Sequence, residues 1–265
     1  MDSFHPTAVI APSAEVDASC EIGPYAVIGP NVRLGPRNVV GPHVVLDGLT
    51  DIGSDNRFLA SCSIGASPQI SGLDREEGRL FIGAGNVFRE FVTVHRGGGG
   101  GVTQIGSRGL FMATAHVAHD CLVGDDVILA NGATLAGHVE IGAAAQVSGL
   151  CAIHQHVRIG ALAFVAGGSI VTQDVPPYCL VQGDRARLVS LNLVGLRRAG
   201  LTTSDLRRLK RLFRTLFQGR GALADRLAAA ESMDGDEHAQ ALVAFIRSSS
   251  RGVITTPRRP LAAAA

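Results

Sequence analysis

An apolar residue recurs at every sixth position through most of the chain. Starting at Ile10, ten successive positions of this series are apolar. The phase returns for three positions from Ile82, and from Ile105 it continues for twelve positions without a failure, as far as Val171. A period of six fits neither an amphipathic α-helix nor one long strand. It indicates a repeat architecture, in which one unit cannot bury its own apolar face but a stack of units can.

Two further positions of the repeat hold small residues. The residue after the apolar one is often glycine, and the fifth is small or β-branched and includes four of the five cysteines. We therefore place those cysteines in the core rather than at a metal or redox site. The repeat describes a short strand and a tight corner, where glycine relieves steric crowding. Three strands make a triangular coil, and coils stack at about 4.8 Å. The pattern predicts a mainly β protein, a parallel β-helix from about Phe4 to Pro176.

The repeat is interrupted twice. Residues 66–81 are polar and lose the pattern, and residues 97–104 are rich in glycine. Both segments are expected to project as loops, and long loops on a rigid scaffold often carry function.

The period changes to that of helices near the C-terminus. Apolar residues recur at helical spacing from Leu206 to Leu216, after Thr203 or Ser204 as the candidate N-cap. Two more helices are expected over 222–232 and 238–248. The predicted domains are a β-helix over 1–183, a helical domain over 184–252 and a disordered tail over 253–265.

Composition excludes several classes of protein. The 265 residues carry a net charge of +1, which gives no overall attraction to nucleic acid or to a membrane surface. The first residues have neither a basic nor a long apolar segment, so a signal peptide is not expected. Five cysteines without a CxxC pair favour neither disulfides nor a zinc ribbon. We expect a cytoplasmic protein with no membrane span and no nucleic-acid partner.

Specific motifs lie between and beyond the repeats. They include NVFREFVTVHRG, ATAHVAHDCLVGDDVILANGATLAGHVEIG, AIHQHVRIG and TQDVPPY. In this combination the chain, over about residues 1–252, resembles the UDP-N-acetylglucosamine O-acyltransferases of lipid A biosynthesis. The resemblance implies a left-handed β-helix and a homotrimer with active sites between subunits. It also implies transfer of a 3-hydroxyacyl chain from acyl carrier protein to the 3-position of the UDP-sugar. No cofactor is implied, since the carrier-protein thioester is a co-substrate.

The repeat frame places the candidate catalytic residues at one corner. His119 and Asp120 are the third and fourth residues of their repeat. Gly137 takes the position of His119 one coil later, so the two should lie side by side. A hydroxyl that attacks a thioester must lose a proton, and neutral imidazole is suited to accept it. By resemblance, His119 is the general base, Asp120 orients it, and the Gly137 backbone N–H stabilises the oxyanion. The alternative is a solvent-facing ladder of polar residues.

The resemblance assigns further residues to the substrates. Those expected to contact the sugar nucleotide or the acyl chain are His95, His116, His138, His154, Gln155, Arg198 and, on a weaker match, Arg185. For the histidines and Gln155, structural contacts between subunits are the alternative. Gly167 matches the position where family members set acyl-chain length by side-chain bulk, so glycine implies room for a longer chain.

The first interruption departs from the family pattern. By length, Ile70 and Gly72 replace an aspartate and a lysine that help to hold the sugar in the family, and Asp74 or Arg75 are the candidate substitutes. The acceptor is therefore open among UDP-N-acetylglucosamine, its 3-amino analogue and another nucleotide sugar.

Two rival functions remain at this point. A γ-type carbonic anhydrase also uses a trimeric left-handed β-helix with histidine zinc ligands, which His116, His119 and His138 could imitate. A scaffold or an inactive sugar-nucleotide binder is the other rival, although the His119–Asp120 pair argues against it.

Overall fold

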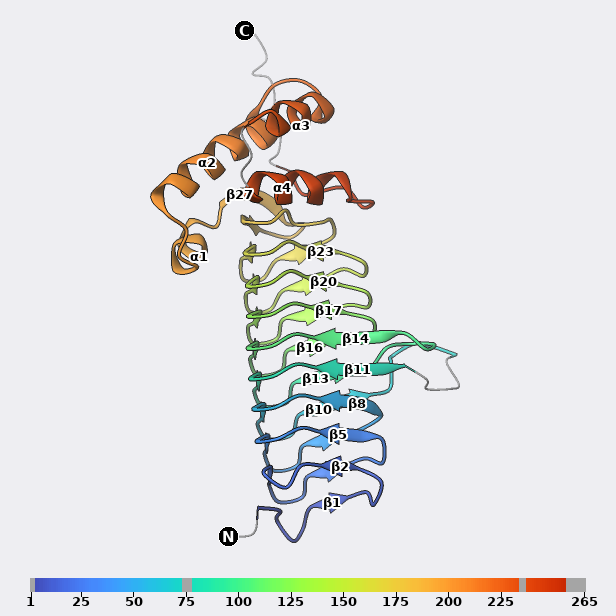
Figure 1. The fold of residues 1–265 in the computed structure, drawn as a ribbon. Helices are drawn as coiled ribbons and strands as arrows, with labels where there is room; N and C mark the ends of the chain where they lie inside the picture. Colours follow the sequence, from blue (N-terminus) through green and yellow to red (C-terminus); the bar gives the residue numbers. More distant parts are fainter. Residues whose placement is uncertain (1–2, 73–77, 234–236, 256–265) are drawn as a thin grey trace.

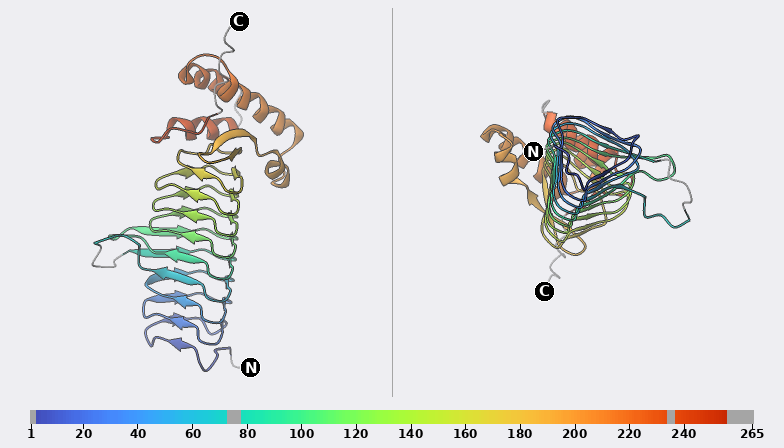
Figure 2. Two further views of the ribbon diagram at one scale, coloured as in Figure 1. Left: turned by 180° about the vertical axis from the view of Figure 1, so that it is seen from behind. Right: turned by 90° about the horizontal axis from the view of Figure 1, so that it is seen from below.

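The computed structural model of the chain describes residues 3–72, 78–233 and 237–255. Most of them wind into a column, with the N-terminus at the bottom of Figure 1 and the C-terminal helices across the top. Viewed along the axis, the coils form a triangle with loops projecting from one corner (Figure 2). The predicted mainly β architecture with a C-terminal helical part is confirmed.

Three sheets form the sides of the column, and successive strands pass from one sheet to the next. The first sheet contains β1 (Val9–Ile10), β4 (Val27–Ile28), β7 (Val45–Leu46), β10 (Ser63–Ala66), β13 (Thr93–His95), β16 (His116–Val117), β19 (Thr134–Leu135), β22 (Ala152–Ile153) and β25 (Ile170–Val171). The second sheet contains β2 (Glu15–Val16), β5 (Val32–Leu34), β8 (Leu49–Ile52), β11 (Arg79–Ile82), β14 (Val102–Ile105), β17 (Leu122–Val123), β20 (Glu140–Ile141) and β23 (Arg158–Ile159). The third sheet contains β3 (Glu21–Ile22), β6 (Val39–Val40), β9 (Arg57–Phe58), β12 (Val87–Phe88), β15 (Leu110–Phe111), β18 (Ile128–Leu129), β21 (Gln146–Val147), β24 (Phe164–Val165), β26 (Cys179–Gln182) and the antiparallel β27 (Arg187–Leu191).

The apolar and small positions of the repeat fill the column, as predicted. Phe58, Phe88 and Phe111 stack in successive coils with ring centroids 4.9 and 4.7 Å apart. All five cysteines are buried and free. Burial raises the pKa of Cys62 to about 11 and that of Cys121 to about 12. These thiols stay protonated at neutral pH, which disfavours a role as metal ligand or redox centre.

The glycine of the repeat serves the stacking of coils rather than the bend at the corner. A Cβ on Gly35 would lie 2.9 Å from the carbonyl oxygen of Gly53 in the next coil. The left-handed backbone belongs to the fourth repeat position, for example Arg37 with φ 57° and Asp120 with φ 59°. The prediction that glycine relieves the corner was therefore wrong: this glycine allows two backbones to approach each other.

Both predicted loops leave the column between the first and second sheets. The first loop (67–78) joins β10 to β11, and the second loop (96–101) joins β13 to β14. Each is shorter than the break in the repeat, because its flanking residues already pair in the sheets.

Helices cover the C-terminal end of the column. They are α1 (Leu193–Arg198), α2 (Thr203–Phe213), the π-helix η1 (Arg214–Gln218), α3 (Leu223–Glu231) and α4 (Glu237–Arg247). The N-cap of α2 is Thr202, not Thr203 or Ser204. Thr202 and Asp205 exchange side-chain and backbone hydrogen bonds in a capping box, which sets the start of the helix. None of the helices in the described ranges is long and apolar enough to cross a bilayer.

Packing continues slightly beyond the predicted end of the helical domain. Val253 pairs with Asp174 in a parallel bridge, and Ile254 is buried. The start of the predicted tail therefore lies against the column, while residues 256–265 lie outside the described residues.

Candidate active site

Five segments of the chain meet at the corner between the first and second sheets, which we call the site corner. They are the described part of the first loop, 67–72, the second loop, 96–101, and the turns at 118–121, 136–139 and 154–157. Since residues one coil apart lie side by side, these segments stack along the column axis. Most of the predicted site residues lie here.

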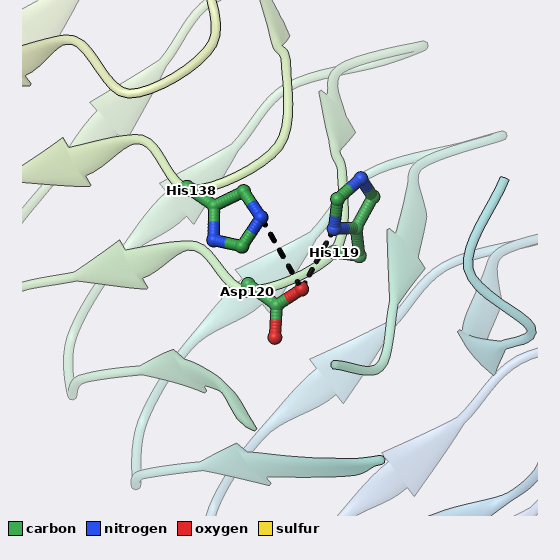
Figure 3. Close-up of side chains that lie close together, drawn as sticks. All are labelled: His119, Asp120 and His138. Atoms are coloured by element: carbon green, nitrogen blue, oxygen red, sulfur yellow. Dashed lines mark hydrogen bonds and ion pairs between the residues drawn. The ribbon is translucent and has the colours of Figure 1, made fainter. Parts of the chain in front are cut away.

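His119 and Asp120 form a hydrogen-bonded pair at the site corner (Figure 3). His119 Nδ1 lies 2.7 Å from Asp120 Oδ2, and the two side chains are only 12% and 11% exposed. A carboxylate can only accept, so the shared proton belongs to Nδ1. The Nε2 atom, which points away from Asp120, then carries a lone pair that can accept a proton.

Gly137 faces the ring of His119 from the next coil. A Cβ at residue 137 would lie 2.5 Å from His119 Cε1 and 2.6 Å from Nε2, so only glycine fits. Among the described residues, nothing accepts a hydrogen bond from the Gly137 backbone N–H. A backbone donor therefore lies beside the imidazole without a partner in the chain.

His95 and His116 form a second pair, with ring centroids 5.2 Å apart and an edge-to-face arrangement. His95 Nδ1 donates to the Ser67 carbonyl oxygen at 2.5 Å, and His116 Nδ1 lies 2.7 Å from Thr93 Oγ1. Burial lowers the pKa of both histidines, and it lowers that of His116 to about 4. Both rings are thus neutral at pH 7 and can serve as hydrogen-bonding groups.

His138 lies on the other side of Asp120. Its Nε2 is 3.8 Å from Asp120 Oδ2, and its ring stacks on His156 with centroids 4.6 Å apart. Burial lowers the pKa of His138, while Asp120 acts in the opposite direction. One ligand atom each of His119, Asp120 and His138 lie within 4.8 Å of one another, a set that could hold a metal ion. The zinc alternative required His116 as a ligand together with His119 and His138. Among the described residues, the third member of the cluster is Asp120 instead.

His154 and Gln155 occupy the next turn of the site corner and are exposed. His154 Nδ1 lies 3.2 Å from the carbonyl oxygen of Gln155 and 3.1 Å from Nη2 of Arg251. Arg251 also donates to the carbonyl oxygen of Thr172 at 3.3 Å. Sequence reasoning missed Arg251, which lies 97 residues from His154 and has no local signal for the contact.

Three predicted residues lie away from the site corner. Arg185 is exposed in the connection from β26 to β27, and Arg198 is exposed at the end of α1. Gly167 lies at the corner between the third and first sheets. Within the described ranges, no hydrogen bond or ion pair joins any of the three to His119 or Asp120.

The first loop brings an apolar side chain to the site corner. Ile70 Cδ1 lies 2.6 Å from the position that a Cβ on Gly98 would take, and Ile70 is 37% exposed. Gly72 has φ 79° and open space around it. Asp74 and Arg75, the candidate substitutes for the missing polar residues, lie outside the described residues.

Two family models match separate parts of the chain. The model described as UDP N-acetylglucosamine O-acyltransferase, domain 2, matches residues 174–254, and a bacterial transferase hexapeptide model matches residues 13–48.

Curated relatives match over nearly the whole length. The acyl-(acyl-carrier-protein)–UDP-N-acetylglucosamine O-acyltransferase of Anaeromyxobacter sp. (strain K) is 48% identical over 254 residues, which cover 95% of this chain and 99% of that protein. The protein of the same name from Myxococcus xanthus is 44% identical over 256 residues, covering 96% and 99%.

Solved structures agree with this result. The UDP-N-acetylglucosamine acyltransferase of Francisella novicida has a TM-score of 0.94 and 32% identity, with 98% of each chain covered. That of Campylobacter jejuni has a TM-score of 0.91 and 36% identity, covering 96% of this chain and 100% of the other. The agreement confirms the left-handed parallel β-helix with its C-terminal helices.

Proposed function

The chain belongs to the UDP-N-acetylglucosamine O-acyltransferase family, and from this premise we propose the reaction and the residues that carry it out. The chain transfers a 3-hydroxyacyl group from acyl carrier protein to the 3-position of UDP-N-acetylglucosamine, the first step of lipid A biosynthesis. The observation that carries the proposal is the 2.7 Å hydrogen bond from His119 to Asp120, with Gly137 against the imidazole ring.

His119 acts as the general base. Its Nε2 takes the proton of the sugar hydroxyl while the oxygen attacks the thioester carbonyl carbon. Asp120 keeps the Nδ1 tautomer and stabilises the imidazolium that forms. The Gly137 N–H donates to the oxyanion of the tetrahedral intermediate. When the intermediate collapses, the C–S bond breaks and the thiolate of the carrier protein leaves with the proton from His119.

The remaining site residues contact the substrates. His138, His154 and Gln155 supply hydrogen-bonding groups along the site corner, and His95 and His116 supply them from β13 and β16. Arg198 contacts the nucleotide phosphates, and Arg185 contacts the substrate on a weaker match. The neutral state of His95 and His116 suits contacts to hydroxyl and amide groups rather than to phosphate.

The acceptor can also be the 3-amino analogue, since the same base serves an attacking amine. Ile70 in the first loop supports this second candidate. In the family, a charged side chain at this position helps to hold the sugar. Ile70 cannot make that polar contact, so an interaction that would select a hydroxyl acceptor is missing.

A homotrimer completes the site in this proposal. Outward-facing apolar residues on the first sheet support an oligomer: Val9, Val27, Val45 and Ile170 are 62%, 39%, 37% and 39% exposed. Gly167 lies at the edge of this sheet that is away from the site corner. In this proposal it sets the acyl-chain length, because the missing side chain leaves room for the chain. The partner is acyl carrier protein, and the place of action is the cytoplasm.

A metal-dependent hydrolytic or hydration activity is the rival that the His119–Asp120–His138 cluster favours. The metal content of purified protein, measured with activity before and after chelation, distinguishes it. Stoichiometric zinc with loss of activity on chelation would favour the rival.

The decisive experiment offers the protein a panel of UDP-sugars and 3-hydroxyacyl carrier proteins, with products identified by mass. We expect one acylated UDP-sugar, formed about 10²–10⁴-fold more slowly by His119→Ala. An amide rather than an ester product would select the 3-amino acceptor, and no acyl transfer to any UDP-sugar would refute the proposal.

A further inference from the structure

The second loop holds Asp120 on the side away from His138. The backbone N–H of Gly98 lies 3.2 Å from Oδ1 and 3.1 Å from Oδ2 of Asp120. The backbone N–H of Asp120 donates to Thr103 Oγ1 at 2.8 Å, in the strand that follows the loop. Both the backbone and the carboxylate of Asp120 are therefore fixed by the preceding coil.

This approach is possible because residue 101 of the loop has no side chain. A Cβ on Gly101 would lie 2.0 Å from Asp120 Oδ1, and one on Gly98 would lie 3.4 Å from Oδ2. The φ of Gly101 is outside the left-handed region, so its backbone suits alanine. The closest conflict of a Cβ is with the Asp120 carboxylate at 2.0 Å, and a second one is with the carbonyl oxygen of Gly98 at 2.9 Å. At Gly99 and Gly100, by contrast, no atom lies within 4 Å of a Cβ.

The two loops pack together over this contact. Ile70 lies against Gly98, and the Asp120 side chain is only 11% exposed. A hydrogen bond shielded from water is stronger than an exposed one. For the same reason, a shielded carboxylate that loses its partners costs more free energy than an exposed one. The arrangement favours one orientation of Asp120, the one that reaches His119 Nδ1.

We infer that Gly98 and Gly101 are positioning residues that hold Asp120 against His119. Gly98 and Gly101 then orient the residue that holds the base, while Gly99 and Gly100 only connect them. The inference rests on the proposed role of His119 as general base. Displacing the Asp120 carboxylate releases the imidazole from its productive orientation, which slows the chemical step and leaves substrate binding in place.

The test is a double-mutant cycle of Gly101→Ala and Asp120→Ala, with kcat and KM measured for acyl transfer. In the wild-type background we expect Gly101→Ala to lower kcat by about tenfold to a hundredfold with KM nearly unchanged. In the Asp120→Ala background, where the carboxylate is absent and the Gly98 carbonyl oxygen is the remaining close contact, the same change should have a much smaller effect on kcat. Gly99→Ala is the matched control, since Ala144 already adopts φ 55°, close to the 54° of Gly99.

Several outcomes overturn the inference. An equal loss of kcat in both backgrounds, a rise in KM alone, or a lower melting temperature in both backgrounds would show that Gly101 acts other than through Asp120. A melting temperature that is lowered only when Asp120 is present supports the contact. Wild-type protein without acyl transfer, or His119→Ala with a wild-type rate, refutes the proposed function itself and the inference with it.

Discussion

The imidazole of His119 lies against the Cα of Gly137, one coil further along the column. A Cβ on residue 137 would lie 2.5 Å from His119 Cε1. The ring is held from another direction by Asp120 at 2.7 Å, so it cannot move aside without losing that hydrogen bond. The stacking of two coils thus sets the position of the candidate base.

Gly137→Ala should therefore reduce activity while the column persists. The new methyl group displaces the ring and crowds the space beside the backbone donor, and we expect kcat to fall by about 10²-fold or more. Steady-state kinetics and a thermal melt would measure both effects. Gly85→Ala, at a different corner with no closer contact than 3.8 Å, is the control; its φ of 70° is left-handed, a region that Ala144 adopts with φ 55° at the same repeat position. Equal kcat values for the two variants would contradict the role of Gly137.

His119→Ala should lower kcat by about 10²–10⁴-fold, the usual contribution of a general base. His119 does not contribute to the apolar core, so the melting temperature and oligomeric state should change little. His43→Ala, which removes an exposed histidine stacked on Tyr25, serves as the control. Wild-type turnover by the His119 variant would require another base.

Gly167→Met should shift the preferred substrate to shorter acyl chains. The nearest atom to a Cβ at this position is 3.6 Å away, so a longer side chain can enter the space that glycine leaves. Each methylene that no longer fits costs about tenfold or more in kcat/KM. Competition among 3-hydroxyacyl carrier proteins of different length, read by product mass, measures the shift. An unchanged profile would separate Gly167 from length selection.

The period of six was enough to predict the column and the faces of its residues. It placed Phe58, Phe88 and Phe111 inside. It also placed His119 next to Gly137, because residues at the same repeat position one coil apart must lie side by side. The family motifs then supplied the chemical roles, which periodicity alone does not contain.

The repeat could not predict contacts made where it is broken or from outside the column. The Gly98–Asp120 hydrogen bonds arise from a loop that has no repeat position, and Arg251 reaches His154 from the C-terminal segment. The role of the repeat glycine was also hidden, since a sequence does not distinguish a residue that bends from one that permits close approach.

Stability should fall in mild acid because of the buried histidines. Burial lowers the pKa of His116 from 6.5 to about 4 and lowers that of His95 as well. Between these values the unfolded chain binds a proton that the folded chain excludes, so the free energy of unfolding falls as pH drops from about 6.5 toward 4. For His116 alone the loss at about pH 5 is about 2 kcal/mol.

His116→Gln removes this dependence and keeps a side chain that can hydrogen-bond to Thr93. Urea unfolding at about pH 7.5 and pH 5 should show the wild type losing about 2 kcal/mol more than the variant on acidification. His43→Gln, at an exposed position, should behave as the wild type does. Equal losses for the wild type and His116→Gln would mean that His116 titrates alike in the folded and unfolded chain, and its place as a neutral hydrogen-bonding group beside His95 would have to be abandoned.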